Sequence, residues 1–209
     1  LFIPQLADAR INDTVSWNRW YSTPSIRATG RTKQGTAVVV YAHIPNFLSN
    51  PANIKEAKLK GLVNYAARIP QDEFQRLVDA EDKQNVRVVD HKILKESPSD
   101  VISLEKALQH PQVIPFLGGE ECAEQYLKEC AEAYGIKTIR VSHSDDLHDE
   151  SALGRLLYLG GDGYSGLGGY DFLGDVGILV GVRQTSAEGA QKIKKYTSQQ
   201  TLEALQQGD

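Results

Sequence analysis

The sequence contains no methionine, only two cysteines and no apolar run long enough to cross a membrane as a helix. No secretory-signal pattern opens it. The missing initiator methionine indicates that the chain was processed or is a piece of a longer one. Together, these features predict a protein that works in the cytoplasm without a membrane partner.

The two cysteines, Cys122 and Cys130, lie eight positions apart in one predicted helix. At a helical rise of about 1.5 Å per residue they are roughly 12 Å apart, which is too far for a disulfide between them. Their spacing also fits no metal-binding motif. They are typical of buried thiols in a reducing compartment.

Charge is ordinary: the net charge is -4 and 24% of residues are charged. This balance argues against a general nucleic-acid-binding surface. Residues 1–34 are the local exception, because Trp17, Trp20 and Tyr21 are interleaved with arginines. Such an arm could bind a nucleic acid strand, or its aromatic rings could pack over the core while the arginines stay solvated. We predict residues 1–34 as an arm packed on the core and residues 35–209 as an α/β domain.

Apolar runs and helical periodicity alternate along the rest of the chain. Unbroken β-branched runs, which are typical of strands buried on both faces of a parallel sheet, predict strands over 35–43, 85–90, 113–117, 136–141 and 176–182. Helical spacing predicts helices over 51–68, 71–83, 104–108, 120–134 and 152–159, with a polar helix from 185. The alternation predicts a single three-layer α/β domain with a mostly parallel sheet.

Four of the five histidines follow directly after predicted strands. Because the carboxyl ends of parallel strands meet at one edge of a sheet, we expect these side chains to converge with nearby acids. Imidazole and carboxylate groups bind Zn²⁺, Mn²⁺ or Mg²⁺. The predicted metal ligands are His43, Asp90, His91, His143, Asp145 and His148.

A metal-bound water would need a general base, and Asp146 or Glu121 is the candidate. The run SHSDDLHD resembles the His-Pro-Asp-Asp-Glu motif of zinc-dependent N-acetylglucosamine deacetylases. Ser144 replaces the proline and the run follows a late strand, so the family's site is not carried over. Alternatively, the loop is simply solvated and its acids cap the next helix.

The segment 160–175 is rich in glycine. Its backbone N–H groups could approach a phosphate, or the segment could close as a lid over a site. The alternative is a surface connection or a hairpin with glycines at positive φ. The predicted cofactor-binding positions are Gly161, Gly163, Gly166, Gly168 and Gly169.

The sequence therefore predicts a metal-assisted hydrolase that acts on a small polar or phosphorylated substrate at the strand ends. A Mg²⁺-dependent nuclease or nucleic-acid-binding protein is the second hypothesis, with the N-terminal arm holding the strand. The third is a non-enzymatic module that binds a nucleotide or sugar phosphate at the glycine loop. The sequence does not predict the oligomeric state.

Overall fold

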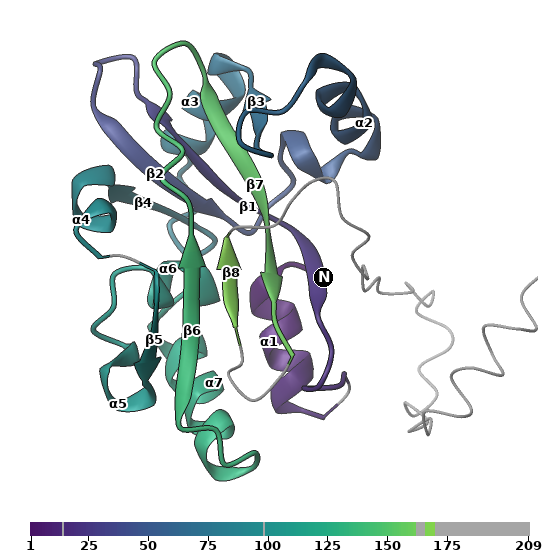
Figure 1. Cartoon of the computed structure of the whole chain (residues 1–209), viewed down its shortest axis with the longest axis vertical. Helices are drawn as coiled ribbons and strands as arrows, with labels where there is room; N and C mark the ends of the chain where they lie inside the picture. The colour runs from purple at the N-terminus through teal and green to yellow at the C-terminus, as the bar shows by residue number, and fades with distance from the viewer. Residues whose placement is uncertain (14, 98, 162–165, 170–209) are drawn as a thin grey trace, which may run out of the picture.

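The structure is a computed structural model and describes residues 1–13, 15–97, 99–161 and 166–169. One sheet dominates it, with the strand order β4-β2-β1-β7-β8-β6-β5 and the short β3 paired to β7 (Figure 1). The strands are β1 (Tyr21–Arg31), β2 (Ala37–Ala42), β3 (Ala67–Ile69), β4 (Val86–Asp90), β5 (Asp100–Ser103), β6 (Thr138–His143), β7 (Ala152–Leu159) and β8 (Leu167–Gly169).

Short helices cover the sheet, α2 and α3 toward one end and α1 and α7 toward the other (Figure 1). They are α1 (Ile3–Ile11), the 3₁₀ turn η1 (Phe47–Ser49), α2 (Pro51–Lys60), α3 (Gln71–Val78), α4 (His91–Lys95), α5 (Leu104–Ala107), α6 (Val113–Leu117) and α7 (Glu120–Glu132). Within the described ranges, none is long and apolar enough to span a membrane.

The predicted mostly parallel, three-layer sheet is wrong. Among the described strands only β6 and β8 pair in parallel; β1 with β2, β1 with β7, β2 with β4 and the others pair antiparallel. The sheet is curled and mixed. The strand β2 is indeed buried on both faces, as its apolar run predicted. The cause is that its alternate residues face two different apolar clusters. Val39 and Tyr41 belong to one cluster, and Val38, Val40 and Ala42 to the other.

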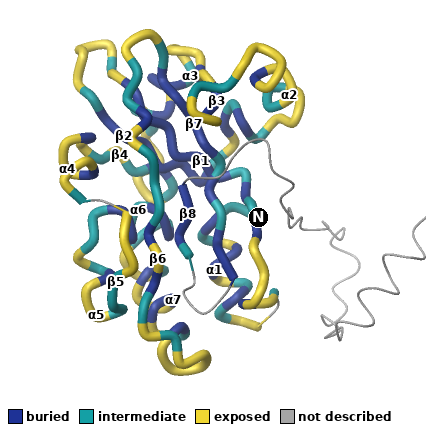
Figure 2. Tube along the Cα trace, viewed as in Figure 1, coloured by how far each residue is buried: buried dark blue, intermediate teal, exposed yellow. Residues whose placement is uncertain are grey.

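The first cluster lies under α1, α6 and α7, and the second lies under α2, α3 and β3. Figure 2 shows the strands at the centre of the sheet buried. The strand β1 runs through both clusters, with Tyr21 in the first and Ile26 in the second. Residues 21–31 are therefore a central strand of the sheet, with hydrogen-bonded neighbours on both sides, within the segment that we expected to be an arm.

Two predicted elements change type. The predicted helix 152–159 is the strand β7, and the predicted strand 113–117 is the helical turn α6. The predicted helix 51–68 begins as expected, with Asn50 as its N-cap and Pro51 at its first position, but it ends at Lys60. The predicted elements from 176 onward lie outside the described residues.

Candidate functional site

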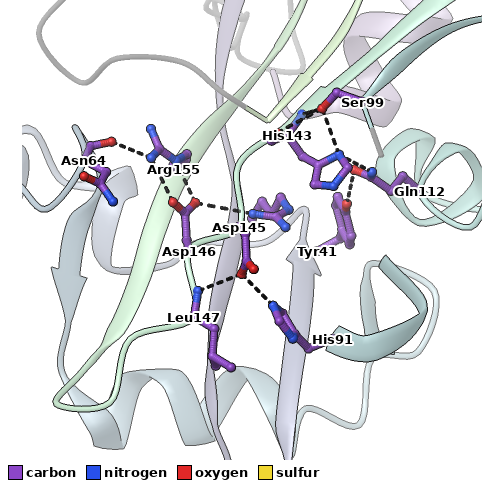
Figure 3. Close-up of polar contacts among 11 residues, drawn as sticks. Tyr41, Asn64, His91, Ser99, Gln112, His143, Asp145, Asp146, Leu147 and Arg155 are labelled. Atoms are coloured by element: carbon purple, nitrogen blue, oxygen red, sulfur yellow. Dashed lines mark hydrogen bonds and ion pairs between the residues drawn. The ribbon is translucent and has the colours of Figure 1, made fainter. Parts of the chain in front are cut away.

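The loop between β6 and β7 is anchored by a buried carboxylate, Asp146 (Figure 3). Arg155 of β7 binds it through two nitrogens, with Nε 2.7 Å from Oδ2 and Nη2 2.9 Å from Oδ1. Arg27 of β1 adds a contact of 3.4 Å from Nη1 to Oδ2. Because this bidentate pair occupies both carboxylate oxygens, Asp146 fixes the loop and is not placed to act as a general base.

The same arginine reaches a second segment. Nη2 of Arg155 also donates to the carbonyl oxygen of Asn64, at 2.5 Å, in the connection between α2 and β3. Removing one partner of such a buried pair leaves an uncompensated charge, which costs about 3–5 kcal/mol. We call Arg27, Asp146 and Arg155 the arginine clamp. The clamp holds the loop 144–151 and the segment 61–66 in a fixed relation.

The neighbouring acid, Asp145, is half exposed and accepts a hydrogen bond of 2.8 Å from Nε2 of His91. Burial alone would raise the pKa of Asp145. The hydrogen bonds from His91 and from the Leu147 N–H, with Lys95 close by, outweigh that effect and lower its pKa. This is the one predicted pair of metal ligands joined by a direct hydrogen bond.

Two other histidines are neutral links inside the fold. Gln112 donates from Nε2 to Nδ1 of His143, and its carbonyl oxygen accepts from the Tyr41 hydroxyl at 2.8 Å. Burial, and then the charges of Arg27 and His110, lower the pKa of His143 to about 4 against weaker raising contributions. The imidazole therefore stays uncharged at neutral pH.

His43 is likewise neutral and hydrogen-bonded inside the protein. Its Nε2 donates to the Pro115 carbonyl at 3.0 Å, so that Nδ1 accepts from the Ser25 hydroxyl at 2.9 Å. The Ser25 oxygen in turn accepts from the Ile3 N–H at 2.8 Å. Burial lowers the pKa of His43 to about 4, with the Pro115 hydrogen bond opposing and Arg87 adding to the shift.

A pocket of about 370 Å³ lies beside the clamp, between α2, β3 and the loop before β7. Its apolar floor contains Phe47, Ala57, Ile69 and Pro70. Its polar groups carry both signs of charge. Two of them come from the end of the loop that the clamp holds, and the others come from α2, β3 and the first residue of α3. These polar residues are Glu56, Lys60, Arg68, Gln71, Glu150 and Ser151.

Ser151 is the most informative of the lining residues. Its Oγ is buried and has no hydrogen-bond partner among the described residues. A buried hydroxyl without a partner costs about 1–3 kcal/mol. Ser151 lines the pocket but its Oγ is shielded from solvent, so a bound polar molecule can supply the missing partner only after the side chain rotates toward the pocket.

No family model matches this chain, and no curated protein matches it. A solved structure described as "Accommodation of massive sequence variation in Nanoarchaeota by the C-type lectin fold" is similar, with 50% sequence identity and a TM-score of 0.74. The alignment covers 81% of this chain and 80% of that one. This chain belongs to the family with the C-type lectin fold.

Membership of the C-type lectin fold family overturns the predicted metal-assisted hydrolase and its α/β architecture. It also gives no support to the nuclease or to a nucleotide module at the glycine loop. A small polar ligand remains compatible with this fold. Nucleic acid is not supported, because Arg10 and Arg27 of the expected basic arm are buried and bonded inside the protein.

A divalent cation is compatible with the C-type lectin fold only in general, and the described residues show no site for one. They contain no group of three or more His, Cys, Asp or Glu side chains that could hold a metal ion. The expected convergence fails because β2 and β4 are antiparallel: Val38 pairs with Asp90 and Ala42 with Val86. His43 and His91 therefore lie at opposite ends of these strands, about 20 Å apart along them.

The other residues that we predicted as metal ligands or as the general base lie apart from one another in this lectin-fold chain. Asp90 caps α4 by accepting from the Lys92 N–H at 2.8 Å, and His148 accepts from the Glu150 N–H at 3.3 Å. Glu121 is exposed in the first turn of α7. No contact in the described part of the chain joins Glu121 to Asp146.

Two of the glycines predicted to bind a cofactor, Gly161 and Gly168, lie where a side chain would not fit. The Gly160 N–H donates to the Gly166 carbonyl at 2.6 Å. A Cβ on Gly161 would lie 2.6 Å from the backbone of Asn18, and one on Gly168 would meet the Tyr158 ring. Gly169 completes β8. Gly163 lies outside the described residues.

The pocket touches the loop in which the sequence predicted a site, but it does so through other residues. Glu150 and Ser151 line the pocket, whereas the histidines and acids just before them hold the loop in place. Arg68 and Gln71 were placed at the end of one predicted helix and the start of another. No sequence motif marks them as neighbours of Ser151.

Proposed function

We propose that this chain is a binding protein and that it binds a carbohydrate in the pocket between α2, β3 and β7. The observation that carries the proposal is its similarity, at 50% identity, to a protein with the C-type lectin fold. No catalytic step is part of the proposal. The cytoplasmic location expected from the sequence stays a prediction.

The pocket supports this ligand class in three ways. Its volume is at the lower end of the range of about 300–1,000 Å³ for small-molecule sites. Its floor is apolar, which suits the C–H face of a sugar ring. Its rim offers carboxylate, amide, hydroxyl and cationic groups to hydroxyls, and Glu56 pairs with Lys60 so that charge is balanced. That balance favours a neutral sugar over a phosphorylated one.

The similar protein is described as accommodating massive sequence variation. By analogy, we propose that the lining of the pocket sets specificity on a constant scaffold. The arginine clamp is the part of that scaffold that keeps the two pocket walls together, since Arg155 binds both Asp146 and the Asn64 carbonyl.

A glycan array followed by calorimetry on the highest-ranking glycan tests the proposal. We expect Ser151→Ala to weaken binding by about 1 kcal/mol, roughly fivefold, because one hydrogen bond to the ligand is lost. Its free energy of unfolding should not fall, since the Ser151 hydroxyl has no partner among the described residues. Ser97→Ala is the matched control, since Ser97 Oγ bonds the Ile93 carbonyl and does not line this pocket.

Two results would contradict the proposal. The first is that no glycan binds the protein. The second is that a glycan binds with the same affinity to the Ser151→Ala and Glu150→Gln variants as to the parent protein.

A further inference from the structure

A partly exposed pair of stacked aromatic rings lies at the end of β7 that is far from the pocket. Trp20, just before β1, is 51% exposed and stacks on Tyr158, with ring centroids 5.0 Å apart and an interplanar angle of 26°. Trp17 behaves differently, because it is buried between Tyr126 and Tyr134. Only Trp20 therefore presents an indole face to solvent.

The position of Tyr158 depends on the strands beside it. Tyr158 pairs with Gly168 of β8 and with Ser22 of β1. A Cβ on Gly168 would lie 1.9 Å from Cζ of the Tyr158 ring, so the ring lies against the bare glycine backbone. A single exposed aromatic residue is common on protein surfaces. Here, however, a second ring and a glycine strand hold the exposed indole in place.

The turn that carries Trp20 is anchored as well. The backbone of Asn18 and Arg19 packs against Gly161, and Arg10 donates from Nη2 to the Arg19 carbonyl at 2.8 Å. Asn18 and Arg19 are exposed and directly precede Trp20 in the chain. The site therefore combines a fixed apolar face with two exposed polar residues next to it in the sequence.

We propose that Trp20, supported by Tyr158, binds the apolar face of a pyranose ring as a second carbohydrate site. The C–H groups on one face of a pyranose pack on an aromatic ring while its hydroxyls remain free for Asn18 and Arg19. The ligand class rests on the proposed function. The site does not, because Tyr158 lies seven residues along β7 from Ser151, a distance of about 23 Å.

The charges near Trp20 favour a neutral sugar over a nucleic acid base, which can also stack on an indole. Arg10 and Arg27 are buried, and Arg31 lies at the far end of β1, about 33 Å along the strand from Tyr21. Of these arginines, Arg19 is then the exposed one next to Trp20 in the sequence, in a chain of net charge -4. A nucleic acid strand needs several such contacts.

Tryptophan fluorescence can test the site directly, because the chain has only two tryptophans and Trp17 is buried. The probes are neutral trisaccharides of glucose, mannose and N-acetylglucosamine. We expect a bound trisaccharide to shift the emission to the blue and to protect Trp20 from iodide quenching. The Trp20→Phe variant, which retains Trp17, should show neither change.

Affinity gives the second readout. We expect Trp20→Ala to weaken trisaccharide binding roughly tenfold, with Trp20→Phe in between, since stacking needs a ring of any aromatic kind. Ile93→Ala, which removes another exposed apolar side chain, is the control and should bind like the parent protein. Thermal unfolding of each variant shows that it is folded.

The outcomes separate the two sites. Unchanged affinity in Trp20→Ala, with binding weakened in Ser151→Ala, overturns this inference and leaves the pocket proposal intact. Binding that depends on Trp20 alone supports the inference and overturns the pocket. Protection of Trp20 by a single-stranded oligonucleotide and by no sugar overturns the inference, and failure of every sugar to bind overturns both proposals.

Discussion

His43 shows how one side chain can link parts of the fold that are far apart in the sequence. A relay of three hydrogen bonds joins the start of α1 to β1, to the end of β2 and to α6. It runs from the Ile3 N–H to the Ser25 hydroxyl, from Ser25 to His43, and from His43 to the Pro115 carbonyl. In this relay Nδ1 accepts, so the imidazole is neutral, and protonation would reverse the direction of the hydrogen bond between Ser25 and His43. We had expected this residue to bind a metal, but both of its nitrogens are already bonded inside the protein.

The neutral histidines predict acid sensitivity. The pKa values of His43 and His143 fall from 6.5 to about 4 on folding, so the unfolded chain binds more protons between these values and stability falls as the pH drops from about 6.5 to about 4. The loss for His43 is about 3 kcal/mol, and it is smaller for the less buried His143. Urea unfolding at several pH values measures it.

The His43→Gln variant provides the control for the pH experiment. A glutamine amide can donate to Pro115 and accept from Ser25 without titrating. We expect this variant to retain only the part of the pH slope that belongs to His143. An unchanged slope would show that His43 is not the titrating group.

At the scale of single elements, β7 explains where sequence reasoning succeeded and failed. The strands β2 and β4 and the helix α7 could be predicted, because their apolar runs and periodicity are unambiguous. In β7, Leu153, Leu156 and Leu157 have helical spacing, yet the segment pairs as a strand with β1. Tertiary pairing decided between two local structures that the residues allow equally.

The pairing of β1 with β7 depends on a close approach at Gly30. A Cβ there would lie 2.7 Å from Cβ and 3.0 Å from Cα of Ala152, neither of which can rotate away. A Cβ on Gly154 meets the flexible ends of Ile69 and Ile26. We therefore expect Gly30→Ala to lower the free energy of unfolding by about 1–3 kcal/mol, and more than Gly154→Ala does. Urea unfolding of the two variants measures the difference, and an equal or reversed order would contradict this account.

At the scale of the whole molecule, the N-terminal segment is part of the core. Ile3 and Leu6 of α1 are fully buried in the first apolar cluster, and β1 is a central strand. The aromatic and basic pattern of residues 1–34 was visible in the sequence. Its place in the sheet was not, because the partner β7 looked helical.

A matched pair of leucine variants tests how far α1 belongs to the core. We expect Leu6→Ala to cost about 2–5 kcal/mol of unfolding free energy, the usual cost of emptying a buried leucine site. Leu59→Ala should cost little, because Leu59 is 80% exposed. Calorimetric unfolding compares them. Equal melting temperatures would mean that α1 is dispensable.

The central position of β1 also constrains how the protein is made. The Thr23 hydroxyl of β1 bonds the Leu157 carbonyl of β7, 134 residues later in the chain. A ribosome therefore releases β1 and β2 long before β7 exists, and one edge of that hairpin stays open until β7 emerges. Pairing of β1 with β7 then closes a long loop, which favours slow folding. Folding of the sheet thus waits for the synthesis of β7.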